Sequence, residues 1–140
     1  MMPSRKLPPL SAVLLLVAGT SVGFAQTSCG SALRPAAVAE LMFGRNIGGR
    51  LGVTEAKWSR FVDREITPRF PNGFSVVDAR GQWFDNERKT IVYESSKLVT
   101  IVFFSEVADD PRLQEIIAAY MTQFKQQSVG LIVRLPCVSF

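Results

Sequence analysis

The chain has 140 residues, 47% of them hydrophobic, with 16 Lys and Arg against 12 Asp and Glu. It contains no histidine, which excludes His-based catalytic triads, His-ligated metal sites and His-ligated haem. The formal net charge is only +4 and the acids and bases are interspersed, so the charge pattern argues against nucleic-acid binding.

The first 25 residues have the pattern of a secretory signal peptide. Arg5 and Lys6 give a basic start, an apolar run covers residues 10–17, and small residues precede a cleavage site after Ala25. A membrane anchor needs about 18 or more apolar residues, and this run is shorter. The sequence therefore predicts an exported protein, periplasmic or secreted, with no membrane span after cleavage and a mature net charge of 14 − 12 = +2.

The two cysteines of the chain are Cys29 and Cys137. In an oxidising compartment they are predicted to form one disulfide that fastens an N-terminal tail, residues 26–35, to the last strand. A redox-active thiol would need a CxxC motif or a nearby activating base, and the sequence has neither. A lipid anchor at Cys29 is disfavoured, because the preceding residues lack the required aliphatic position. Residues 36–140 are predicted to form a single domain.

The first half of this domain is predicted to contain two strands around a helix. Residues 36–44 alternate as a strand, and a glycine-rich connection follows. Thr54 is a cap for a helix whose apolar residues recur at helical spacing, and Pro68 ends that helix. Residues 74–81 are predicted as the second strand, with Gly81 as a break.

The second half completes a ferredoxin-like pattern. Residues 82–96 are predicted as an irregular hairpin or excursion, and residues 97–104 as a third strand that is apolar on both faces. Asp110 and Pro111 begin the second helix, and residues 128–136 form the last strand. The order is β-α-β-β-α-β, an α+β fold with a four-stranded antiparallel sheet and two helices on one face. In this arrangement the first strand lies between the third and the fourth.

Alternation along the strands assigns side chains to the two faces of the sheet. The helix-covered face is predicted to hold Leu41, Phe43, Val77, Val99, Ile101, Phe103, Leu131 and Val133. The opposite face is predicted to carry Val38, Glu40, Met42, Val76, Asp78, Arg80, Leu98, Thr100, Val102, Phe104, Ile132 and Arg134, with Glu40 and Arg134 paired across neighbouring strands. Because residues 97–104 are apolar on both sides, three covers for this face are considered: residues 82–96, a second subunit, or a ligand.

Several segments resemble an uncharacterised family of secreted bacterial proteins, domain of unknown function family 3574. They are "LMFG", "TEAKWSRFVDREITPRFPNGFSVVDARGQW" and "YESSK". The matching positions are Phe43, Gly44, Trp58, Phe61, Thr67, Pro68, Arg69, Phe70, Pro71, Gly73, Gly81, Gln82, Trp83, Glu94, Ser96 and Lys97. Asn72 and Ser95 depart from a more usual Asp and Pro. The resemblance implies export and a small α+β domain, and it implies no activity.

One group of side chains is predicted as a candidate ligand site: Arg69, Gln82, Trp83, Glu94 and Lys97. They lie on segments that bracket the second and third strands. Arg69 is predicted to pair with Glu94, with Trp83 alongside, and the charges would hold a small anion through charge-assisted hydrogen bonds. The alternative is a buried ion-pair network with a structural role. No metal or cofactor is predicted, since the nucleotide-binding glycine spacings are absent and helix capping explains Asp109 and Asp110.

Two functions follow as hypotheses. The first is a binding or interaction module that forms a homodimer through the uncovered face of its sheet. The second is a small enzyme, or a receptor, for an anionic or aromatic small molecule. In that case Glu94 would be the acid or base, and Arg69 and Lys97 would hold the anion.

Overall fold

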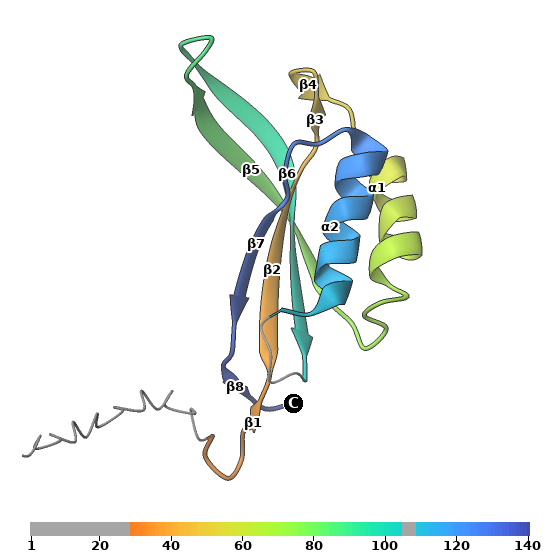
Figure 1. The fold of residues 1–140 in the computed structure, drawn as a ribbon, viewed down its shortest axis with the longest axis vertical. Coiled ribbons are helices and arrows are strands. Elements are labelled where there is room, and N and C mark those ends of the chain that lie inside the picture. Colours follow the sequence, from red (N-terminus) through yellow and green to blue (C-terminus); the bar gives the residue numbers. More distant parts are fainter. Residues whose placement is uncertain (1–28, 105–108) are drawn as a thin grey trace, which may run out of the picture.

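The computed structural model describes residues 29–104 and 109–140 (Figure 1), so the predicted signal peptide lies outside the described residues. The strands are β1 (Arg34–Pro35), β2 (Ala37–Gly44), β3 (Asn46–Ile47), β4 (Arg50–Leu51), β5 (Ser75–Asp85), β6 (Thr90–Phe103), β7 (Gly130–Arg134) and β8 (Cys137–Val138). The helices are α1 (Glu55–Phe61), the π-helical segment η1 (Val62–Ile66) and α2 (Pro111–Phe124). Within the described part of the chain, no helix has the length and apolar character needed to cross a membrane.

Four strands form the main sheet, in the order β5-β6-β2-β7, and each neighbouring pair is antiparallel. Strand β2, the first of the four along the chain, therefore lies between the third and the fourth, as predicted. Both helices pack on one face of this sheet (Figure 1). The remaining short strands form two small pairs, β3 with β4 and β1 with β8.

The predicted helix starts are confirmed by their hydrogen bonds. The Thr54 hydroxyl accepts from the Lys57 amide at the start of α1, and the Asp110 carboxylate accepts from the Arg112 amide at the start of α2. The first helix continues as η1, where the Thr67 amide donates to the Val62 carbonyl, five residues back, at 2.9 Å. Such a widened turn adds one residue per hydrogen-bonded ring. Capping residues and apolar periodicity do not encode it, and the sequence prediction missed it.

Residues 82–96 form the hairpin that was one of the two predicted alternatives, but its strands are regularly paired, so the predicted irregularity and the alternative of an excursion are wrong. Strand β5 continues through Gly81 to Asp85. Strand β6 begins at Thr90, and every residue of β5 pairs with a residue of β6. Gly81 does not break the strand, because its backbone stays extended and it lies opposite Glu94 in the register. The outer half of this hairpin, residues 81–94, projects beyond the helices (Figure 1), and we call it the hairpin arm.

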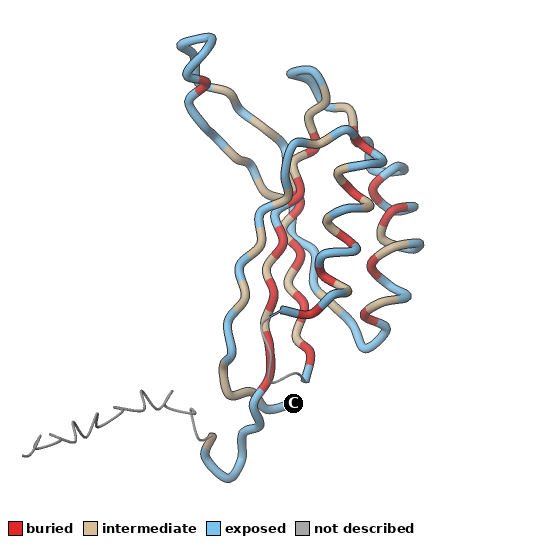
Figure 2. The backbone as a smooth tube through the Cα atoms, viewed as in Figure 1, coloured by how far each residue is buried: buried red, intermediate tan, exposed pale blue. Residues whose placement is uncertain are grey.

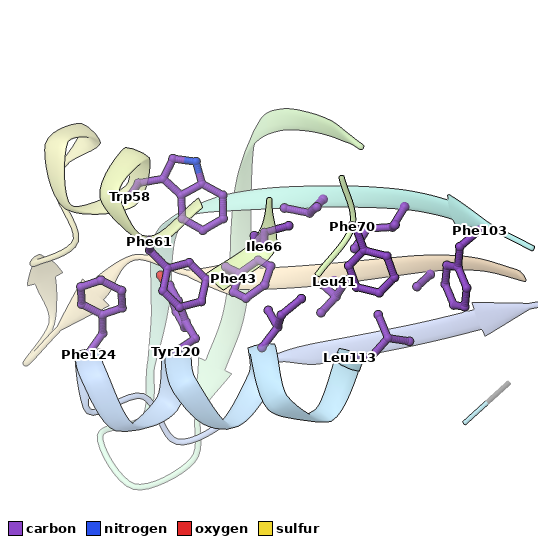
Figure 3. Packing of buried hydrophobic residues seen from close by; sticks show 14 of the residues in the cluster. Leu41, Phe43, Trp58, Phe61, Ile66, Phe70, Phe103, Leu113, Tyr120 and Phe124 are labelled. Carbon is purple, nitrogen blue, oxygen red and sulfur yellow. The ribbon is translucent and has the colours of Figure 1, made fainter. Parts of the chain in front are cut away.

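The core lies between the helices and the covered face of the sheet, and aromatic rings dominate it (Figure 3). Phe43 from β2 lies 4.7 Å from Tyr120 of α2 and 5.3 Å from Trp58 of α1, between ring centroids. The Tyr120 hydroxyl donates to the Gly44 carbonyl at 2.8 Å, so the polar end of this buried ring is satisfied. At the other end of the sheet, Phe70 packs against Phe103 and is buried in the core.

The face assignment is confirmed for β2 and β6 and is wrong for β5. In the register Val76 lies opposite Val99 and Val77 lies opposite Leu98. Directly opposite residues share a face, so Val76 and Asp78 lie on the helix side and Val77 lies on the other side. The two adjacent valines made the alternation ambiguous by one residue, and such a shift exchanges the faces of a whole strand.

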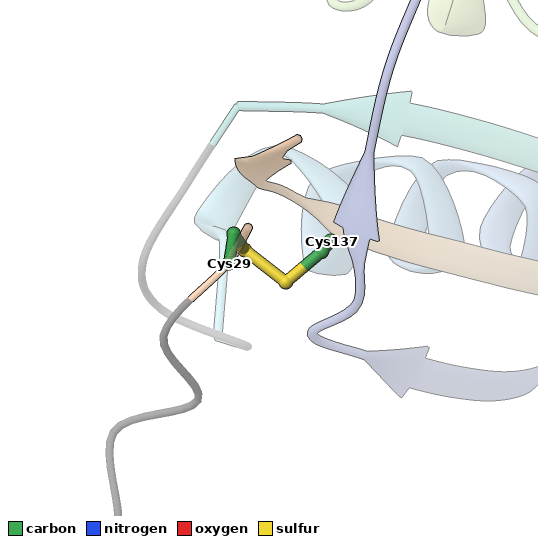
Figure 4. The surroundings of a disulfide bond; sticks show 2 residues. All are labelled: Cys29 and Cys137. Atoms are coloured by element: carbon green, nitrogen blue, oxygen red, sulfur yellow. A yellow bond between two sulfur atoms is a disulfide. The ribbon is translucent and has the colours of Figure 1, made fainter. Parts of the chain in front are cut away.

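The predicted disulfide is present: Cys29 is bonded to Cys137, with the Cα atoms 5.6 Å apart (Figure 4). Cys137 belongs to β8, which pairs with β1 just before the first strand of the main sheet. The bond therefore fastens the N-terminal segment to a short strand after Pro136, one element later than predicted.

We predict that the double variant Cys29→Ser/Cys137→Ser loses stability through the unfolded chain. The disulfide closes a loop with a sequence separation of 108, and a loop of that size contributes about 4–5 kcal/mol to the free energy of unfolding in the chain-entropy model. Urea unfolding of the oxidised wild type and of the variant measures the difference, and the reduced wild type should match the variant. A loss below about 1 kcal/mol would contradict this origin of the stability.

Candidate functional site

Arg69 does not pair with Glu94, so this part of the predicted site is wrong. Its Nε donates to the Glu115 carboxylate of α2 at 2.9 Å, and its Nη1 donates to the carbonyl and the carboxylate of Glu65 at 2.8 and 2.9 Å. The hydrogen bond that Arg69 donates to Glu115, with the charge of Glu65, raises the pKa of Arg69 above its ordinary value. Arg69 thus ties the end of the first helix to the second helix.

Glu94 has a local structural role at the edge of the sheet. Its Oε1 accepts from the Asn46 amide at 3.0 Å, and its side chain lies across Gly44. A Cβ at position 44 would lie 2.6 Å from the same oxygen, so a larger residue there would push the Glu94 carboxylate out of this position. The contact holds the start of β3 against β6.

Lys97 belongs to a compact ion network with Arg45, and sequence reasoning missed its partners. The side chains of Arg45 and Lys97 are 7% and 6% exposed, although both are charged. Glu55 bridges them, with one oxygen 2.7 Å from Arg45 Nη1 and the other 3.0 Å from Lys97 Nζ. Asp78 lies on the same side of the sheet and pairs with Lys97.

The electrostatics of this network favour the charged forms. Burial works against the Lys97 ammonium, but hydrogen bonds to Asp78 and Glu55 outweigh it and raise the pKa of Lys97. The hydrogen bond from Lys97 lowers the pKa of Glu55 and, separately, the pKa of Asp78. Arg45 also donates through Nε to the Val53 carbonyl at 2.9 Å. Two buried cations are therefore neutralised by carboxylates that remain largely in solvent.

A shallow pocket of about 440 Å³ adjoins this network. It is lined by Arg45, Asp78, Ala79, Arg80, Ser95 and Ser96. The carboxylates already occupy the donors of Arg45 and Lys97, so in this arrangement the network holds the strands together rather than presenting free cations.

Gln82 and Trp83 lie on the hairpin arm, far along β5 from Arg69. Trp83 is eight residues beyond the start of β5, which is roughly 26 Å of extended chain. Both side chains are exposed. The five predicted residues therefore do not converge on one point, and a ligand-binding role for Arg69, Gln82, Trp83, Glu94 or Lys97 stays a prediction.

The face of the sheet opposite the helices carries a second group of candidate residues. Exposed apolar side chains on this surface, the open sheet face, are Met42, Val77, Trp83 and Ile132. The predicted cross-strand pair is present there, with Arg134 Nη2 2.7 Å from Glu40 Oε2. Figure 2 shows that the hairpin arm is mostly exposed as well, and it carries Phe84, Ile91 and Tyr93 in addition to Trp83.

We predict that Glu55→Gln/Asp78→Asn loses stability in a pH-dependent way. Both carboxyls have lowered pKa values in the folded chain, from ordinary values of 4.5 and 3.8. As the pH falls, these groups therefore take up protons at a higher pH in the unfolded chain than in the folded chain. The stability that they contribute is full above about pH 4.5 and is lost as the pH falls through the folded pKa values. Urea unfolding from pH 7 to pH 3 should show wild type and variant converging in acid.

The matched control for this comparison is Asp63→Asn/Glu87→Gln. These carboxylates are exposed, and within the described ranges neither has an ion-pair partner within 4.0 Å. The control should differ little from wild type at any of these pH values. A difference of the same size at pH 7 and pH 3 for the Glu55/Asp78 variant would contradict the assignment.

Solved structures share this fold at low sequence identity. A phage SAM lyase in complex with S-methyl-5'-thioadenosine matches with a TM-score of 0.56 and 16% identity, over 84% of this chain and 97% of that chain. CutA from Synechococcus elongatus PCC7942 matches with a TM-score of 0.50 and 11% identity, over 78% of this chain and 87% of that chain. At these identities the likeness concerns the fold alone. Among curated proteins, none matches the sequence.

The family resemblance predicted from the TPRFP, GQW and ESSK segments is confirmed. The sequence pattern of one family matches residues 38–140, from the second residue of β2 to the end of the chain. Those residues include the main sheet, both helices, the ion network and the hairpin arm. The chain belongs to the family described as "Protein of unknown function (DUF3574)".

Proposed function

We propose that this protein is an exported interaction module of ferredoxin-like topology that forms a homodimer through its open sheet face. The observation that carries the proposal is the set of exposed apolar side chains on that face, above all Val77 and Met42, which lie on either side of Leu98 on neighbouring strands. An exposed apolar patch of this kind marks an interaction site on a soluble protein. A second sheet can pack face to face on such a sheet.

The arrangement of the chain leaves the face to a partner. Residues 82–96 extend the sheet as paired strands rather than folding back over it, so they do not cover Met42 or Ile132. Of the three covers considered from the sequence, a second subunit and a ligand remain. Two pockets lie away from this face, one near Lys97 and the other beside the two helices. The exposed apolar residues of the face come from β2, β5 and β7, a spread that suits a second subunit better than a small ligand.

The charges of the open sheet face are compatible with a second copy of the same chain. In a two-fold dimer a surface meets itself, so a surplus of one sign would repel. Here Glu40 and Arg134 neutralise each other at 2.7 Å. An apolar surface with one internally paired acid and base carries no such surplus.

The hairpin arm supports the same conclusion. A two-stranded hairpin alone is only marginally stable in water. Trp83 of the arm is exposed on the same face as Val77, so a copy packed on the open sheet face can cover it. Phe84, Ile91 and Tyr93 lie on the opposite face of the hairpin and stay outside this interface. The disulfide and the signal-peptide pattern both suit assembly after export.

We predict that Val77→Lys separates the dimer into monomers while Val76→Lys does not. The two valines are adjacent on β5 but lie on opposite faces, and they are 54% and 38% exposed. A buried lysine ammonium at the interface would be left without a partner. Size-exclusion chromatography with light scattering should give twice the single-chain mass for wild type and Val76→Lys, and the single-chain mass for Val77→Lys.

Circular dichroism of both variants checks that each remains folded. A wild type that elutes with the mass of one chain at all concentrations up to about 100 μM would overturn the proposal, since a useful dimer forms in this range. Equal disruption by both substitutions would point to a loss of folding rather than to this interface.

A further inference from the structure

The structure contains a second basic region, separate from the Arg45–Lys97 network and from the open sheet face. It is an open pocket of about 490 Å³ lined by Ile47, Lys57, Arg60, Gln123, Phe124 and Lys125. These residues come from β3, from α1 and from the C-terminal end of α2, which lie side by side at one end of the molecule (Figure 1). We call it the basic groove.

The cations of the basic groove lack acidic partners. Lys57, Arg60 and Lys125 line it, and no carboxylate does. Across residues 29–104 and 109–140, none of the three has an acidic group within 4.0 Å, whereas Arg45, Arg69 and Lys97 each have two. Lys57 and Arg60 are three residues apart on one helix, so their like charges face the same side and repel.

Part of this arrangement has a structural explanation and part does not. Lys125 ends α2 in the left-handed conformation, where the helix dipole favours a cation. The Lys57 ammonium donates to the Gly52 carbonyl at 2.8 Å, which holds it at the rim. Among the residues that the structure describes, no such contact accounts for Arg60. Within that part of the chain no carboxylate compensates the three charges, and an anion in the groove would compensate them.

The floor of the groove is apolar. Phe124 is buried in the aromatic core, and Ile47 is partly buried against the same core. The exposed amide of Gln123 adds one polar group at the side. A volume of about 490 Å³ lies within the range of roughly 300–1,000 Å³ for small-molecule sites. The groove therefore offers positive charge at its rim beside a small hydrophobic surface.

We propose that the basic groove binds an amphiphilic phosphate monoester, with the phosphate between Lys57, Arg60 and Lys125 and the apolar part on Ile47 and Phe124. A phosphate monoester carries about −1.5 to −2 charges at neutral pH, which suits three cations better than a single carboxylate does. The guanidinium of Arg60 can hold two phosphate oxygens at once. This binding does not depend on self-association of the chain.

The test is calorimetric titration of the oxidised protein with octyl phosphate and with inorganic phosphate. We expect one octyl phosphate per chain, with tighter binding than inorganic phosphate because of the apolar floor. In Arg60→Gln/Lys125→Asn the affinity should fall at least about tenfold, since each charge-assisted contact is worth about that much. Asparagine tolerates the left-handed conformation at position 125, so this variant keeps the helix end.

The matched control is Arg64→Gln/Lys89→Asn. It removes the same number of charges from the same residue types, and Lys89 has a positive φ of 54°, close to the 52° of Lys125. Arg64 and Lys89 do not line the groove, so the control should bind octyl phosphate as wild type does. Equal losses in both variants, or equal affinities for octyl phosphate and inorganic phosphate, would overturn the proposal.

A membrane surface is the other source of the same chemistry, and sedimentation with vesicles distinguishes it. Binding to phosphatidylglycerol vesicles but not to phosphatidylcholine vesicles, without binding of monomeric octyl phosphate, would replace the proposed site by surface docking. Binding of monomeric octyl phosphate that is lost in Arg60→Gln/Lys125→Asn supports the groove as a site for an individual molecule.

Discussion

The packing of Phe43 against rings from both helices is the interaction on which the rest of the structure depends. Phe43 is near the end of the central strand β2, and it contacts Trp58 and Phe61 of α1 and Tyr120 of α2. One side chain thus joins the middle of the sheet to the whole helical layer. The groups just after it in the chain, Gly44 and Arg45, are held in place by the same cluster, because the Tyr120 hydroxyl donates to Gly44. The ion network is built directly beyond that anchored point.

The elements buried against this core could be predicted from the sequence, and the exposed ones could not. Thr54 and Asp110 mark helix starts because a cap is a local interaction. The central strands show alternating apolar residues because one of their faces is covered by the helices of the same chain. Strand β5 is an edge strand that is exposed on both faces over most of its length, so neither face selects its apolar residues. Its orientation was therefore ambiguous at Val76 and Val77, and its continuation through Gly81 had no signal in the sequence.

In the candidate site, the sequence identified charged residues that take part in ion pairs, but it did not identify the residues with which they pair. Arg69 has acidic residues available on several segments, and only the packing of the helices selects Glu65 and Glu115. Lys97 was named from the sequence, but Glu55 and Asp78 come from a helix start and an edge strand whose positions depend on the tertiary fold. Arg45 was missed as its companion because no local pattern distinguishes a buried arginine after a strand from a solvated one. The tertiary fold decides which charged side chains come together, and the spacing of residues along the sequence does not reveal this.

The contact between Glu94 and Gly44 has an evolutionary consequence. The two positions belong to different strands and are coupled, because a side chain at position 44 would displace the Glu94 carboxylate from the place where it accepts from Asn46. A relative with alanine at position 44 is expected to carry a shorter side chain at position 94, and to fasten the β3 amide in another way. The energetic effects of changing both positions should therefore not be additive. If the residues at positions 44 and 94 covary among relatives, that covariation would reflect the close approach between the Gly44 backbone and the Glu94 side chain.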